Sequence, residues 1–127
     1  MRLLGNGQLS PDFDAECRGT REILNRVGDK WSVLLVVILG SGSQRFNELR
    51  RALDGISQRV LTSTLRGLER DGLVSRTVRP TNPRQVEYAL TQLGTSLLEP
   101  VSVLATWAQG HRADVQRARA AYDRAAR

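Results

Sequence analysis

The chain has few of the residues that catalysis or metal binding requires. It contains one cysteine, Cys17, and one histidine, His111. A single cysteine excludes an internal disulfide and leaves a free thiol or an intermolecular bridge. One cysteine and one histidine are also too few ligands for a structural zinc site, so we expect no metal. Because the sequence lacks paired carboxylates, a phosphate-binding glycine motif and a nucleophile elbow, we expect no catalytic residues, no cofactor and no enzymatic activity.

Long apolar segments are also missing. The longest apolar run, residues 33–39, is too short to span a bilayer. The N-terminal residues lack the apolar core and the small-residue cleavage site of a signal peptide. We therefore expect a cytoplasmic protein with no membrane partner, and the length of 127 residues predicts one domain.

Positive charge is abundant and unevenly distributed. The formal net charge is +6, and 18 of the 19 basic residues are arginine. Residues 43–85 carry nine arginines against four acidic residues, whereas residues 1–42 are balanced and residues 86–127 nearly so. A local basic patch is typical of a phosphate-binding surface. Arginine-rich codon usage is the alternative explanation, but usage alone would not concentrate the charge in one third of the chain.

The N-terminal part predicts an arm followed by a short helix. Residues 1–16 contain few periodic apolar residues, so we expect a flexible arm there. Ile23, Leu24 and Val27 then form a helical face that ends at Gly28.

Two further segments precede the charged third of the chain. Asp29 can cap a segment over residues 30–39, whose valine-rich content fits either a helix or a buried strand. Residues 44–46 fit a very short strand. Periodicity alone does not decide whether residues 30–39 form a helix or a strand.

Two helices come next. Apolar residues recur at helical spacing over residues 46–53, and this short helix ends at residues 54–55. The clearest helix covers residues 57–71, because Ser57 is a good N-cap and Gly72 is a typical residue after a helix end.

A hairpin and a last helix complete the chain. Two strand-like runs, residues 73–79 and 85–90, flank a proline-containing loop and predict a β-hairpin. Thr91 can cap a long final helix, which Pro100 should bend. Residues 111–127 either extend this helix or fray.

The order of these elements is the plan of a winged helix-turn-helix. The expected fold class is mainly α with a small β-hairpin wing (α+β). In such proteins the N-terminal residues of the second helix of the pair meet base edges in the major groove. Here those residues are Ser57, Gln58 and Arg59, and arginine and glutamine can each form two hydrogen bonds with one purine. The alternative is an amphipathic surface helix with a solvated polar face.

Five blocks of residues occur in an order found in a known family. They are residues 28–31 (GDKW), 45–49 (RFNEL), 55–62 (GISQRVLT), 65–74 (LRGLERDGLV) and 86–91 (VEYALT). With these blocks the chain resembles the HxlR-type regulators, which are relatives of the MarR group.

The resemblance implies a division of the chain and a mode of binding. It covers about residues 17–110, the expected winged helix-turn-helix domain, which the predicted flexible arm over residues 1–16 precedes and a C-terminal helical extension or tail over residues 111–127 follows. It also implies a helix over residues 30–39. The expected partners are a second copy, paired through helices at both termini, and double-stranded DNA that carries an inverted repeat.

The resemblance also assigns DNA contacts to three places: the second helix of the pair, the residue before its supporting helix, and the wing. The wing departs from the family pattern, because Arg84 is followed by Gln85 instead of standing directly before Val-Glu-Tyr. On a strand this displacement would turn the arginine to the other face, so its entry into the minor groove stays open. The candidate contacts are Arg45, Ser57, Gln58, Arg59, Thr62, Ser63, Arg66, Arg76, Arg79, Arg84 and Gln85.

Cys17 matches a cysteine that several members of this family use to sense oxidants or electrophiles. Arg21 lies one helical turn away, and a nearby guanidinium group favours the reactive thiolate, whereas Glu16 opposes it. The alternative is a semi-buried structural cysteine, because a lone cysteine is often inert when buried.

Apolar residues beyond the needs of the compact core predict a dimer. Two recognition helices about one turn of DNA apart can read a palindrome. The resemblance implies that the helix over residues 18–27 and the terminal helix form the partner surface, and the alternative makes Trp107 an ordinary core residue. The candidate dimer residues are Ile23, Leu24, Leu97, Val101, Leu104 and Trp107.

Together these observations predict a sequence-specific repressor that binds a palindromic operator as a homodimer and responds to oxidants through Cys17. Three alternatives remain open. One is a regulator of the same fold that responds to a small molecule or to no effector. The others are a non-specific nucleic-acid-binding protein and a winged helix used for protein contacts.

Overall fold

The computed structural model describes residues 13–126, with side chains from residue 17 onward. Its first element, α1, covers Phe13–Val27. Residues 13–16 are therefore helical, which corrects the predicted arm over residues 1–16, and the rest of that arm lies outside the described residues. The predicted end of this helix before Gly28 is confirmed.

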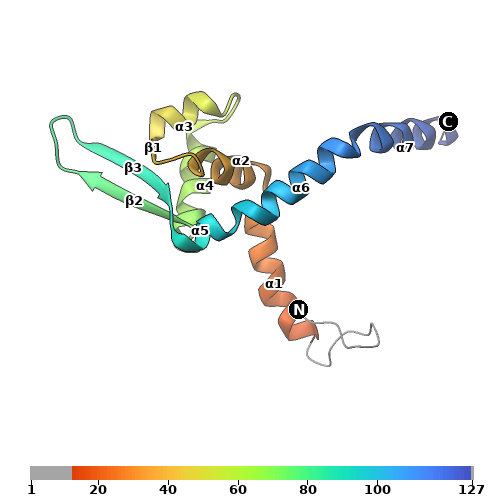
Figure 1. The fold of residues 1–127 in the computed structure, drawn as a ribbon, viewed down its shortest axis with the longest axis horizontal. Helices are drawn as coiled ribbons and strands as arrows, with labels where there is room; N and C mark the ends of the chain where they lie inside the picture. Colours follow the sequence, from red (N-terminus) through yellow and green to blue (C-terminus); the bar gives the residue numbers. More distant parts are fainter. Residues whose placement is uncertain (1–12, 127) are drawn as a thin grey trace.

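The remaining elements form a mainly helical chain with one small sheet, as Figure 1 shows, and the predicted α+β class is confirmed. In chain order they are α2 Lys30–Leu39, β1 Gln44–Arg45, α3 Phe46–Ala52, α4 Gln58–Arg70, β2 Val74–Arg79, β3 Gln85–Leu90, α5 Gln92–Ser96, α6 Leu98–Gly110 and α7 Arg112–Ala125.

The segment that fitted either a helix or a strand, α2, is a helix. Its predicted cap is confirmed, because Asp29 Oδ2 accepts hydrogen bonds from the backbone N–H groups of Trp31 and Ser32, each at 3.1 Å. The helix is apolar on nearly every side, with Leu35 and Leu39 buried and Val37 exposed. Periodicity could not identify it for that reason.

The sheet has three antiparallel strands in the order β1-β3-β2. β2 and β3 form the predicted hairpin, in which Val74 lies opposite Leu90 and Arg79 opposite Gln85. β1 pairs with the other side of β3, with Arg45 opposite Glu87. The strand expected over residues 44–46 stops one residue earlier, because Phe46 already belongs to α3.

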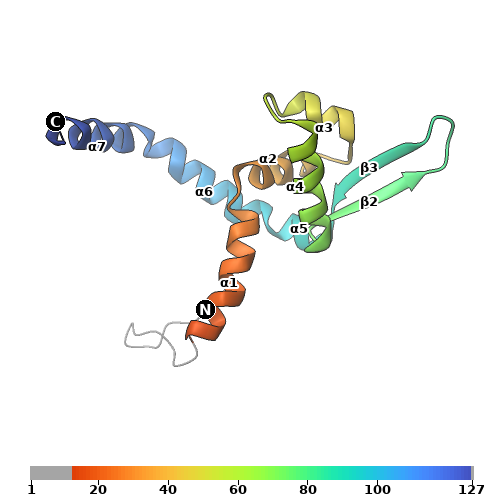
Figure 2. The ribbon, with the colours of Figure 1, turned by 180° about the vertical axis from the view of Figure 1, so that it is seen from behind.

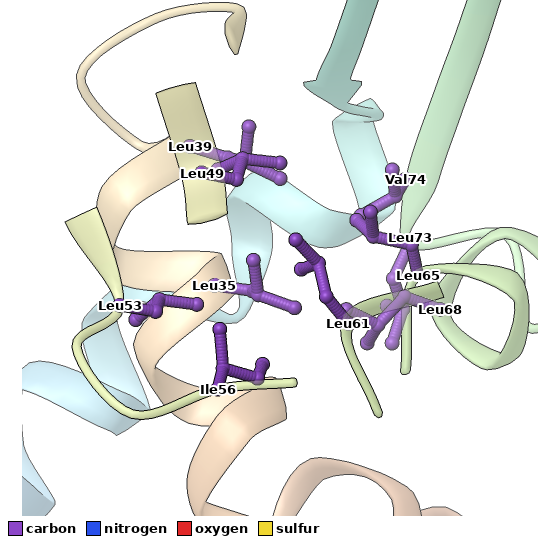
Figure 3. Packing of buried hydrophobic residues seen from close by; sticks show 10 residues of the cluster. All are labelled: Leu35, Leu39, Leu49, Leu53, Ile56, Leu61, Leu65, Leu68, Leu73 and Val74. Carbon is purple, nitrogen blue, oxygen red and sulfur yellow. The ribbon is translucent and has the colours of Figure 1, made fainter. Parts of the chain in front are cut away.

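The core lies among α2, α3, α4 and β2, where leucine side chains converge (Figure 3). Burial of one such side chain typically contributes about 1.5–3 kcal/mol to stability. Because α4 contributes three leucines to this cluster, its inward face is fixed and its opposite face remains free. The cluster comprises Leu35, Leu39, Leu49, Leu53, Ile56, Leu61, Leu65, Leu68, Leu73 and Val74.

The last predicted helix is interrupted earlier than expected. We expected a bend at Pro100, but α5 ends at Ser96 and α6 begins at Leu98. In a continuous helix the ring of Pro100 would collide with the carbonyl group of Ser96, four residues earlier. The break at Leu97 removes this collision and places Pro100 in the first turn of α6, where a missing N–H group costs little.

Two helical arms extend from the core in different directions, and both views show this arrangement (Figures 1 and 2). One arm is α1, and the other is α6 followed by α7. Of the two outcomes expected for residues 111–127, the helical one holds for residues 112–125. Among the described helices, none is long and apolar enough to cross a membrane.

Candidate nucleic-acid interface

Helix α4 is held in place by its cap and its buried face. Ser57 Oγ accepts a hydrogen bond from the backbone N–H of Val60 at 3.1 Å, which confirms the predicted N-cap. Leu61, Leu65 and Leu68 point into the core and are almost fully buried. Thr64 is buried beside them, whereas the polar residues on the opposite side of the helix point away from the core.

These polar residues form a shallow open groove of about 540 Å³, which we call the recognition face. It is lined by Gln58, Arg59, Thr62, Ser63 and Arg66. All are exposed except Thr62, which is half-buried. Among the side chains of residues 17–126, neither Arg59 nor Arg66 forms an ion pair with a carboxylate, so both guanidinium groups are available to an external anion.

The turn before α4 fixes where the recognition face begins. Gly55 has a φ of 85°, a left-handed conformation that glycine adopts without strain. Leu53 and Ile56 on either side of this turn are buried in the core. Ser57, the remaining predicted contact at this end of the helix, is exposed.

Arg45 lies at the junction of β1 and α3. Its backbone N–H donates a hydrogen bond to Glu48 Oε1 at 2.9 Å, and the residue is exposed. In the sheet it lies opposite Glu87, which is partly buried. The predicted phosphate contact is thus on the surface, beside an acidic neighbour.

The wing arginines do not share one face. Because side chains alternate along a strand, Arg76 lies on the same face as Tyr88 opposite it, whereas Arg79 lies on the face of Glu87. Arg79 Nη2 forms an ion pair with Glu87 Oε2 at 3.3 Å. Arg76 and Arg79 therefore lie on opposite faces of the wing.

Arg84 lies in the loop before β3, which begins at Gln85. The argument from strand alternation therefore does not apply to Arg84, because the residue is not in a strand, and its entry into the minor groove stays open. Both Arg84 and Arg76 are exposed, and Gln85 is half-buried at the end of the ladder.

Cys17 lies in α1 and is a free, partly exposed thiol. Arg18 and Arg21 beside it are exposed on the same helix. The side chains that the structure describes, those of residues 17–126, include no group of three His, Cys, Asp or Glu residues that could hold a metal ion.

The predicted dimer residues divide into two groups. Ile23, Leu24, Leu104 and Trp107 are more than half exposed on α1 and α6. Val101 and Leu97, in contrast, lie inside the protomer: Val101 is only 7% exposed, and Leu97 packs against the core.

Sequence reasoning missed part of the exposed surface on α6. An open apolar groove of about 850 Å³ is lined by Glu99, Pro100, Val103, Leu104 and Trp107. Val103 is 65% exposed and was not predicted. The spacing of Pro100, Val103, Leu104 and Trp107 at i, i+3, i+4 and i+7 is the signal that could have identified it.

Comparison with known proteins gives consistent matches over most of the chain. A family model described as HxlR-like helix-turn-helix matches residues 26–116. The chain is 42% identical over 95 residues to the uncharacterized HTH-type transcriptional regulator YtfH of Escherichia coli K12, a match that covers 75% of each protein.

Two solved structures are also similar. The YtfH protein of Salmonella typhimurium gives a TM-score of 0.72 at 39% identity and covers 79% of this chain and 89% of its own. The redox regulator HypR in its reduced form gives a TM-score of 0.73 at 37% identity, with coverage of 78% and 98%. Its oxidised form gives 0.68 at 39% identity, with coverage of 72% and 95%.

Proposed function

The chain belongs to the HxlR-like helix-turn-helix family of transcriptional regulators, and from this premise we propose that it represses transcription by binding an inverted-repeat operator as a homodimer. The family membership confirms the resemblance inferred from the sequence and the winged-helix fold. The protein is a helix-turn-helix transcriptional regulator and not an enzyme. Repression is the simplest outcome, since a dimer on promoter DNA excludes polymerase.

The recognition face is the observation that carries the operator proposal. It places glutamine and arginine at the N-terminal end of α4, the part of a recognition helix that meets base edges. Gln58 and Arg59 each suit a purine, and Arg66 lies about two turns further along to bind phosphate or another base. Arg45 and the wing arginines add exposed positive charge on β1, on β2 and in the loop before β3.

The exposed apolar residues of α1 and α6 support the homodimer. Large apolar side chains that cluster on a surface typically mark an interface. Ile23 and Leu24 on one arm and Leu104 and Trp107 on the other would be covered in a dimer. One small module makes few base contacts, and two copies would double their number.

Selection of DNA from a random library, followed by competition at fixed salt concentration, tests this proposal. We expect the protein to select an inverted repeat and to bind it roughly 10³-fold or more tightly than unrelated duplex DNA. Equal binding to all sequences would identify a non-specific DNA-binding protein. No retention on DNA would identify a winged helix that serves protein contacts.

We extend the proposal to the signal. Cys17 is a partly exposed thiol on α1, the helix that also carries the candidate dimer residues Ile23 and Leu24. The similar protein HypR is a redox regulator with structures in reduced and oxidised forms. Oxidation of Cys17 would therefore alter the pairing of the two protomers and, through it, the separation of their recognition faces. The alternative signal is a small molecule in place of an oxidant, and the apolar groove on α6 is the surface that could bind it.

A further inference from the structure

One contact joins the last turn of α1 to the last turn of α4. Arg26 Nε donates a hydrogen bond to Asp71 Oδ2 at 2.8 Å, and the two residues are 45 positions apart in the chain. Arg26 belongs to the final turn of α1, and Asp71 caps the end of α4. The contact therefore links the helix that carries Ile23 and Leu24 to the helix that carries the recognition face.

Gly67 makes room for this contact. A Cβ atom at position 67 would lie 2.0 Å from Arg26 Nη1 and 2.4 Å from its Cζ, so the guanidinium group lies directly against the bare α-carbon. Gly67 does not have a positive φ, so the backbone does not require a glycine here. Glycine inside a helix is destabilising relative to alanine. The close approach of Arg26 is the feature of the structure that accounts for it.

The ion pair contributes little stability of its own. The side chains of Arg26 and Asp71 are 32% and 36% exposed, and exposed pairs of this kind contribute little because water screens the charges. Its geometry is more informative than its energy. The guanidinium group lies at the C-terminal ends of both helices, where the helix dipoles favour a positive charge, and it offsets the unfavourable position of Asp71 at the end of α4.

The rest of α1 has little to fix its direction. Val27 packs against the core, but α1 then leaves the body, as Figures 1 and 2 show. At Gly28 the chain turns into α2, with a hydrogen bond from its N–H to the carbonyl of Leu24 at 2.7 Å. The angle between α1 and α4 therefore depends on the last turn of α1, where Arg26 contacts α4 and Val27 packs against the core.

We propose that Arg26 is a positioning residue: its contact with Gly67 and Asp71 sets the angle between α1 and α4, and thereby the spacing of DNA half-sites that the dimer prefers. The inference rests on the homodimer and operator proposed above. The contact lies at the base of α1, so a change in its angle changes the separation of the two recognition faces, and the change grows with the length of α1. A small change in angle at Arg26 would therefore move each recognition face relative to its half-site.

A distance measurement within one protomer tests the first half of this inference. Spin labels are attached to Cys17, the single native cysteine, and to an introduced cysteine, Glu69→Cys, in full-length protein diluted with an excess of unlabelled chain. We expect a narrow distance distribution that broadens or shifts in Arg26→Ala and in Gly67→Ala. The exchanged pair Arg26→Asp with Asp71→Arg should restore part of the narrow distribution. Gly19→Ala is the matched control, since a Cβ there meets nothing within 4 Å.

A series of operators tests the second half. The selected half-site is placed at its preferred spacing and at spacings changed by one or two base pairs. The unsubstituted protein should prefer one spacing, and Arg26→Ala should reduce that preference about tenfold while binding to a single half-site stays unchanged. Gly67→Ala should act in the same way but have no further effect when Arg26 is already alanine. A structural role limited to folding would instead lower binding to all spacings equally.

The outcomes separate the two proposals. Unchanged label distances in both Arg26→Ala and Gly67→Ala overturn the positioning role, whatever the DNA measurements give. Changed distances with an unchanged spacing preference overturn the link to operator spacing. Selection of no inverted repeat by the unsubstituted protein overturns the homodimer proposal and the spacing assignment together, and this result is obtained before any variant is made.

Discussion

At the scale of single residues, Arg59 has the side chain best suited to sequence discrimination. It is exposed at the start of α4 and forms no ion pair with the described side chains of residues 17–126. Arginine can bond O6 and N7 of one guanine together, and losing such a contact costs about 1–3 kcal/mol. We therefore expect Arg59→Ala to lose about 1–3 kcal/mol of binding to the selected operator and to tolerate base changes at one position.

Titration of the operator and its single-base variants measures this effect. Arg124→Ala is the control, because it removes the same charge from α7, remote from the recognition face (Figure 1). An equal loss on all sequences would mean that Arg59 contacts phosphate rather than a base.

Cys17 gives a second prediction at this scale. With one cysteine per chain, oxidation by diamide must join the thiols of two chains, since no internal partner exists. We expect diamide to form a disulfide-linked dimer and to lower operator affinity, because the bond constrains α1 in both protomers. Non-reducing electrophoresis and operator binding of the same sample measure the two effects. Cys17→Ser should bind the operator like the untreated protein, and diamide should not change its affinity. Full oxidation of the thiol without a change in operator affinity would refute the sensor role.

Local chemistry was easier to predict than contacts between distant residues. Asp29, Ser57 and Thr91 were each expected to cap a helix and each does, because a cap depends only on a side chain and the next three residues. The pairing of Arg26 with Asp71 could not be predicted, since it arises only when α1 and α4 meet in the fold.

At the scale of elements, α2 shows how a cap decides between two structures. Its apolar composition allowed a strand, whereas the two hydrogen bonds to Asp29 Oδ2 satisfy N–H groups that only a helix start leaves free. We expect Asp29→Ala to lower the free energy of unfolding by about 0.5–2 kcal/mol and Asp29→Ser to retain most of the stability. Urea denaturation followed by circular dichroism gives both values. Equal stability of Asp29→Ala and the unsubstituted protein would show that packing alone holds α2.

The wing supplies a prediction about charge. Glu87 pairs with Arg79 and lies opposite Arg45, so one carboxylate reduces the positive charge at two candidate phosphate contacts. Glu87→Gln should bind DNA more tightly and with a steeper dependence on salt, by roughly one released counterion. Binding at several salt concentrations measures the slope. Glu69→Gln, on α4, is a control for the loss of one charge, and an identical change there would mean that net charge and not the wing is responsible.

Element boundaries were predictable where glycine or a cap ends the helix and less so where a proline acts from a distance. As expected, α1 ends at Val27, directly before Gly28, and α4 ends at Arg70, shortly before Gly72. The break at Leu97 precedes Pro100, because in a continuous helix the proline ring would collide with a carbonyl group of the preceding turn. The residues that line the groove on α4 were all expected on the side away from the core, since helix periodicity fixes which residues share a side, whereas their contact with DNA stays a prediction.

At the scale of the whole molecule, the two helical arms leave several large apolar side chains exposed. Leu104 and Trp107 on α6 are 63% and 56% exposed and border an open groove. A carboxylate placed there would have to be buried without a partner if this surface pairs with a second copy, which is strongly unfavourable. We therefore expect Leu104→Asp to convert the dimer to a monomer. Binding to the full operator should weaken by more than about tenfold, while binding to a half-site is retained.

Light scattering during size-exclusion chromatography gives the oligomeric state, and titration of full and half operators gives the two affinities. Ser102→Asp is the matched control, because it adds the same charge to the opposite side of α6, where the residue is exposed. If both variants stay dimeric, α6 is not the dimer contact, and the pairing must run through α1 alone. If Leu104→Asp is monomeric but still binds the full operator with native affinity, the operator is read by independent protomers. The inverted repeat would then reflect two separate binding events instead of one dimer.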